Sequence, residues 1–187
     1  MATKIYIDQG HNPVNPNAGA EGNGLREQDI VYEIGVRLAA ILRAAGFETR
    51  LSRPTPETQL GTSNASSLAA RVNDANSWGS DYFISLHTNA STSTNSTGSE
   101  AYVYRTDSRA GVLASNILEE LSESTGLRNR GVAARPSLYV LRRTAMPAVL
   151  VELGFITNPY DAALMSTQPE LFASGVANGV LAYFGML

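Results

Sequence analysis

Apolar residues follow two different periods along this chain, and segments of the two kinds alternate. In residues 25–45 they recur every three or four positions, which predicts an amphipathic helix that ends before Gly46. Residues 68–78, 108–124 and 169–184 have the same helical spacing. The chain is therefore expected to form several helices with one buried stripe each.

Shorter runs between these helices have the alternating or continuous apolar character of strands. They are residues 4–8, 47–51, 81–86, 99–104, 137–141 and 148–151. The last run, Ala-Val-Leu-Val, is apolar throughout, as expected for a central strand that helices cover on both faces. Strands that alternate with helices predict an α/β layer fold with a largely parallel sheet.

The composition narrows the class of protein. A length of 187 residues predicts one domain with a substantial core, and a net charge of −3 without a basic stripe gives no footprint for nucleic acid. The absence of cysteine excludes disulfides, cysteine-bound zinc and a thiol nucleophile. No run approaches the roughly 20 apolar residues of a membrane span, and the first residues do not form a signal peptide. We therefore expect no membrane insertion, and export by another component if the protein works outside the cell.

Three residues suited to metal or acid–base chemistry stand where predicted strands end. His11 follows the first strand, His87 follows residues 81–86, and Glu152 ends the apolar run 148–151. The carboxyl ends of parallel strands meet at one edge of a sheet, which is where ligands bind in such folds. We therefore expect these three side chains to lie close together.

Glu27 is a fourth candidate, in the first turn of the helix predicted for residues 25–45. It precedes Ile30 and Val31 by three and four positions, so it shares their buried stripe. A helix that follows a strand begins near the carboxyl end of that strand, so Glu27 is expected near His11. A carboxylate on an apolar face needs a partner, because burying an unpaired charge is costly.

Two imidazoles and one carboxylate can hold zinc and leave a position for water or substrate, and a second carboxylate can move a proton of that water. Each residue also has a structural explanation. Glu27 would be favoured by the helix dipole, His11 would be a loop histidine, His87 would hydrogen-bond to its loop, and Glu152 would pair with an arginine such as Arg142.

Six blocks of the sequence carry a family resemblance. They are IYIDQGHNP, GLREQDIVYEIGVRLAAIL, DYFISLHTNAS, GSEAYVY, NRGV and MPAVLVELGFITN, spread from about Lys4 to the final helix. They resemble the signatures of zinc-dependent N-acetylmuramoyl-L-alanine amidases of type 3, the family of bacterial autolysins, sporulation lysins and phage endolysins. The resemblance implies that residues 1–187 form one zinc amidase catalytic domain, a three-layer α/β domain whose twisted, mostly parallel sheet of about six strands is flanked by helices.

The resemblance also implies roles for the candidate residues. One Zn²⁺ per chain would be held by His11, Glu27 and His87. Glu152 would be the general base, and then the general acid, in hydrolysis of the amide that joins N-acetylmuramic acid to L-alanine. The substrate would be peptidoglycan, and the protein would act at the cell wall.

One block departs from the family pattern. The family has Gly-His-Gly-Gly after the first strand, whereas this chain has Gly-His-Asn-Pro and a long loop. Glu21 in that loop is a rival ligand to Glu27, which we prefer because the helical stripe follows it directly. Asn89, two residues after His87, and Arg142 are predicted to contact the substrate.

Other functions remain open at this stage. A zinc peptidase or deacetylase could use the same site on another cell-wall amide, and a non-catalytic module could bind peptidoglycan without turnover. Targeting to the wall could come from a separate module or partner. A serine hydrolase is disfavoured, because the chain lacks a Gly-x-Ser-x-Gly elbow.

Overall fold

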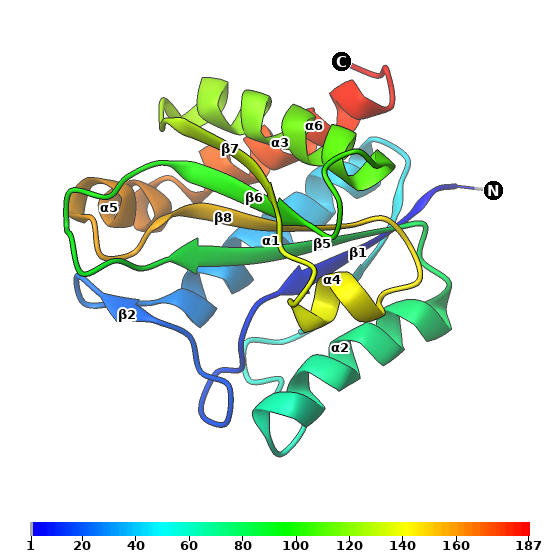
Figure 1. Ribbon diagram of the computed structural model, residues 1–187, viewed down its shortest axis with the longest axis horizontal. Helices are drawn as coiled ribbons and strands as arrows, with labels where there is room; N and C mark the ends of the chain where they lie inside the picture. The colour runs from blue at the N-terminus through cyan, green and yellow to red at the C-terminus, as the bar shows by residue number, and fades with distance from the viewer. Residues whose placement is uncertain (1) are drawn as a thin grey trace.

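A six-stranded sheet runs through the middle of the computed structural model, which describes residues 2–187 (Figure 1). Its strand order is β4-β1-β5-β8-β6-β7. The strands are β1 (Lys4–Gln9), β4 (Glu48–Leu51), β5 (Tyr82–Asn89), β6 (Ser99–Val103), β7 (Asn129–Ala134) and β8 (Ala148–Phe155). β6 pairs antiparallel with β8, and the other neighbours in this sheet are parallel. The predicted α/β fold with a mostly parallel sheet is thus confirmed.

Helices cover both faces of the sheet and complete a three-layer domain (Figure 1). They are α1 (Glu27–Ala44), α2 (Asn64–Trp78), α3 (Arg109–Thr125), α4 (Tyr139–Arg143), α5 (Pro159–Thr167) and α6 (Pro169–Tyr183). α1, α3 and α6 form one buried apolar cluster with one face of the sheet, and α2 and α4 form another with the opposite face. None of the helices within residues 2–187 combines the length and apolar character that a membrane crossing requires.

The sheet face under α2 and α4 changes from apolar to polar along its strands. Because side chains alternate in a strand, Phe83, Ser85 and His87 of β5 lie on this face, as do Leu150 and Glu152 of β8. Phe83 and Leu150 belong to the apolar cluster that α2 and α4 cover. The polar residues follow toward the carboxyl ends of the strands, so one face carries both an apolar packing surface and the polar candidate residues His87 and Glu152.

Two strands are longer than the sequence predicts. β5 continues from residue 86 to Asn89, and β8 continues from residue 151 to Phe155. His87 and Glu152 therefore lie inside strands, not beyond them. Each polar residue interrupts the apolar run that marks a strand, although the backbone hydrogen bonds continue past it.

The predicted strand over residues 137–141 is wrong. This segment enters α4, where Val140 and Leu141 are buried. A short apolar run has the same appearance in a strand and in a single buried helical turn, so periodicity cannot separate them.

Three further elements were not predicted. They are β7, α5 and a small hairpin of β2 (Glu21–Gly22) and β3 (Leu25–Arg26) that precedes α1. α5 had a readable start signal, because the side chain of Asn158 caps it and Pro159 occupies its first turn.

Candidate metal centre

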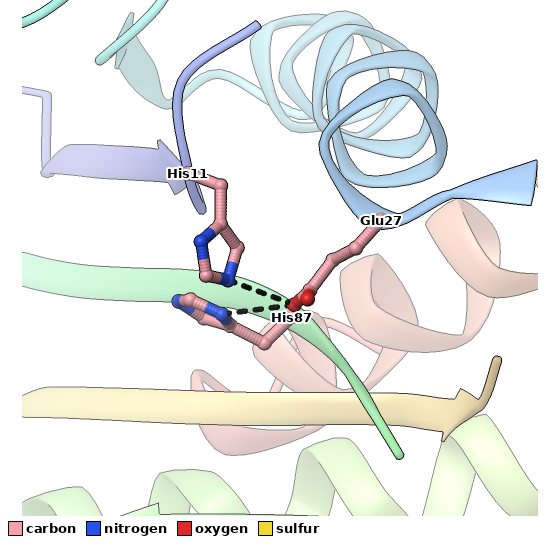
Figure 2. A group of neighbouring side chains, drawn as sticks. All are labelled: His11, Glu27 and His87. Carbon is pink, nitrogen blue, oxygen red and sulfur yellow. Dashed lines mark hydrogen bonds and ion pairs between the residues drawn. The ribbon is translucent and has the colours of Figure 1, made fainter. Parts of the chain in front are cut away.

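Three side chains from separate elements converge at the carboxyl end of β1 and β5 (Figure 2). His11 follows β1, Glu27 opens α1, and His87 lies in β5. Glu27 Oε1 lies 3.2 Å from His11 Nε2 and 3.1 Å from His87 Nδ1. One ligand atom from each residue lies within 4.8 Å of the others, so the group can hold a metal ion.

The Glu27 carboxylate is buried and fully engaged, with 3% of the residue exposed. Its Oε1 accepts a hydrogen bond from the Thr88 backbone N–H at 2.9 Å, and its Oε2 accepts one from the Ala20 N–H at 2.9 Å. Burial alone would raise its pKa, but hydrogen bonds with His11 and His87 lower the pKa well below the ordinary value. Glu27 is therefore an ionised, oriented carboxylate, as a metal ligand must be.

The backbone of His11 has an unusual conformation. His11 has a φ of 67°, in the left-handed region that residues other than glycine avoid at a cost of about 1–3 kcal/mol. Its imidazole packs edge-on against that of His87, with 4.9 Å between ring centroids. The surrounding structure holds this strained backbone in place, which is typical of functional sites.

The His87 side chain packs so closely against Gly10 that only glycine fits at this position. A Cβ at this position would lie 2.5 Å from His87 Cε1 and 2.7 Å from the Leu86 carbonyl oxygen. We expect Gly10→Ala to displace His87, to weaken metal binding, and to lower the free energy of unfolding by about 1–3 kcal/mol. Metal titration and urea unfolding measure these effects.

Gly154→Ala is the matched control for this substitution. Its added Cβ would meet atoms of Asp161 and Met165 at 3.4 Å, an ordinary van der Waals distance. Wild-type metal affinity in Gly10→Ala would show that the close contact with His87 does not govern the site.

Glu152 lies beside His87 with a free carboxylate oxygen. The two residues are direct partners in the β5–β8 register, and Glu100 of β6 is the partner of Glu152 on its other side. Glu152 Oε2 is buried and makes no hydrogen bond among the described residues. Burial raises the pKa of Glu152 to about 7, with Glu27 and Glu100 adding to the rise and His87 opposing it. A carboxyl group in this state can both accept and donate a proton near neutral pH.

Asn89 and Arg142, the predicted substrate contacts, lie in different places. The Asn89 side chain donates a hydrogen bond to Glu100 Oε1, so it faces the row that contains Glu152. Arg142 is exposed on α4 and lines a cavity of about 400 Å³ with Arg105 and Arg109. That cavity shares no lining residue with a smaller one, about 130 Å³, which His11 and His87 line.

The rival ligand Glu21 lies outside the group. It is exposed in β2, whereas Glu27 is the carboxylate that contacts both imidazoles. Sequence reasoning missed Glu100, which accepts hydrogen bonds from Asn89 and from Tyr102. Its place beside Glu152 depends on the antiparallel pairing of β6 with β8, which no local pattern in the sequence indicates.

The donor set fits a catalytic metal ion. Two imidazole nitrogens and one carboxylate oxygen are the protein ligands in one class of catalytic zinc site, and such sites keep a further position open. The adjacent carboxyl of Glu152 supplies a proton acceptor that is not itself one of the three converging groups. Together the fold and the site define an α/β domain with the groups that metal-assisted hydrolysis requires.

Comparisons with known proteins identify the family. The family model described as N-acetylmuramoyl-L-alanine amidase (Amidase 3) matches residues 5–182. The chain is 35% identical to the N-acetylmuramoyl-L-alanine amidase CwlM of Bacillus licheniformis over 188 residues, which is 98% of this chain and 69% of that protein. It is 36% identical to the amidase LytC of Bacillus subtilis over 96% of this chain and 35% of that protein.

A solved structure agrees with these relatives. The catalytic domain of CwlV, an N-acetylmuramoyl-L-alanine amidase from Bacillus (Paenibacillus) polymyxa, superposes with a TM-score of 0.86 at 28% identity and covers 99% of both chains. The chain belongs to the N-acetylmuramoyl-L-alanine amidase family. The reaction of this amidase family is hydrolysis of the bond between N-acetylmuramic acid and L-alanine in peptidoglycan.

Proposed function

We propose that this chain is a zinc amidase catalytic domain in which His11, Glu27 and His87 hold one Zn²⁺ and Glu152 is the catalytic acid–base residue. The observation that carries the proposal is the contact of one buried carboxylate with both imidazoles, beside a second carboxyl that has a free oxygen. A bound zinc ion supplies Lewis-acid chemistry, which polarises an amide carbonyl and makes water more acidic.

Glu152 moves the proton in this proposal. Its free Oε2 takes a proton from the attacking water, and the same carboxyl then donates that proton to the departing amine of L-alanine. Burial supports both steps, because it raises the pKa of Glu152 to about 7 and so brings it close to neutral pH.

The flanking residues have supporting roles in the proposal. Glu100 and Asn89 hold one another beside Glu152, so Asn89 is placed to contact substrate or to orient this row. Arg142 lies farther along the α4 side, where its guanidinium would meet a more distant, anionic part of the peptidoglycan. We propose that the protein acts at the cell wall, with targeting supplied by a further module or partner.

The test is to identify the amine that the protein releases from purified peptidoglycan. The new free amines of the digested peptidoglycan are labelled, the material is hydrolysed to amino acids and sugars, and the labelled products are identified. After digestion with zinc-loaded protein the label should be on L-alanine. After digestion with chelator-treated protein no new label should appear. New amines on another amino acid would indicate a peptidase, and new amines on a sugar would indicate a deacetylase. Binding to peptidoglycan without new amines would indicate a non-catalytic module.

A further inference from the structure

A buried arginine, Arg71 of α2, reaches the backbone that carries His11. Only 1% of Arg71 is exposed. One of its terminal nitrogens donates to Asp8 Oδ1 at 2.6 Å and to the Gln9 carbonyl oxygen at 2.6 Å. Its other terminal nitrogen donates to the carbonyl oxygen of His11 itself. A single guanidinium thus binds the last residues of β1 and the ligand residue that follows them.

Asp8 fixes the arginine in turn. It is as buried as Arg71, and its second oxygen accepts a hydrogen bond from the Ser85 hydroxyl at 2.7 Å. Ser85 stands two residues before His87 in β5. The Asp8–Arg71 ion pair is therefore next to both histidines. All four residues line the same small cavity.

The backbone conformation of His11 explains why a contact such as that with Arg71 is needed. His11 occupies the left-handed region with a φ of 67°. A residue with a side chain keeps that conformation only where its surroundings hold it. A hydrogen bond from a charged donor is roughly twice as strong as a neutral one, and the planar guanidinium reaches several acceptors at fixed angles.

Stability alone does not account for the pair. Removing two charges from water costs much of what their attraction returns, so a buried ion pair is weak support for a fold. We infer that Arg71, oriented by Asp8, is a positioning residue that holds the His11 backbone in the geometry required for metal binding. This inference rests on the proposed metal site, and it assigns Arg71 no contact with substrate.

The test compares zinc affinities, measured by competition with a chelator. The double variant Asp8→Asn with Arg71→Met removes both charges, so it leaves no unpaired ion in the interior. We expect its zinc affinity to fall roughly 10- to 100-fold, the range typical of groups that orient metal ligands. Its activity should recover as free zinc is raised, and its circular dichroism spectrum without zinc should match that of the wild type, which a general loss of folded protein would not allow.

Arg71→Lys is the conservative variant. An ammonium retains the charge but lacks the planar fork that reaches Asp8 and His11 together, so we expect an intermediate loss of zinc affinity. Because this variant keeps the buried charge, it decides the question if the double variant does not fold.

Asp74→Ala is the matched control on the same helix. Asp74 accepts a hydrogen bond from Tyr6 and pairs with Arg50, so its loss loosens α2 from β1 away from His11. We expect it to lower the melting temperature and to leave zinc affinity unchanged. Wild-type zinc affinity in folded Arg71 variants would overturn the inference, whereas wild-type protein that binds no zinc would overturn the proposed metal site.

Discussion

Glu152→Gln is expected to lower kcat by roughly 10²- to 10⁴-fold while the protein keeps its zinc and still binds peptidoglycan. Glutamine has nearly the same shape but cannot take a proton from water or return one to the amine. Glu152 is not one of the three residues proposed to bind zinc, so metal content should not change. Amine release from peptidoglycan, metal content and sedimentation with insoluble wall measure the three quantities.

The stability of this variant provides an internal control. Burial raises the pKa of Glu152, so the folded protein favours the neutral form. At a pH above the ordinary carboxyl pKa, the Glu152 carboxyl is ionised in the unfolded chain, where water solvates its charge. The same ionised group is buried in the metal-free folded protein, so it lowers the free energy of unfolding. The variant should therefore melt no lower than wild type at pH 8. Full activity in a folded, zinc-loaded Glu152→Gln protein would contradict the assignment of the base.

His87→Ala is expected to abolish tight zinc binding. The wild-type protein should contain about one zinc ion per chain after loading and dialysis, and the variant less than roughly a tenth of that, because two of three protein ligands remain. Elemental analysis measures the content directly. Amine release should fall with the metal.

Glu21→Ala is the control for this measurement, because it removes the rival carboxylate from the exposed hairpin. It should keep the zinc of the wild type, whereas Glu27→Ala should lose it. If Glu21→Ala lost zinc and Glu27→Ala retained it, the carboxylate ligand would be Glu21 and not Glu27. Zinc at the wild-type level in His87→Ala would reject the site altogether.

The sequence predicts those parts of the site that depend on local patterns. His11, His87 and Glu152 are indicated by their positions, because each interrupts or follows an apolar run, and Glu27 is indicated because it begins a helical stripe. These signals need no knowledge of which strands are neighbours. The mostly parallel sheet brings the residues together once it forms.

The remaining parts depend on long-range pairing. Glu100 is the antiparallel neighbour of Glu152 although the two residues are 52 positions apart in the sequence (152 − 100), and Arg71 contacts Asp8 across 63 positions. The error at α4 has a different cause, since a five-residue element has too few positions to establish a period. Local patterns thus locate the reactive groups, and tertiary contacts determine their supports.

The sheet face under α2 and α4 is apolar at one end and polar at the other, so the proposed site depends on the correct register of the strands. In the native register His87 stands directly opposite Glu152. A slip of β5 by one residue would turn His87 into the apolar layer under α1, α3 and α6, and would send Leu86 to the reactive face. A chain misfolded in this way would lose the proposed site along with its core, so only correctly folded chains could be active.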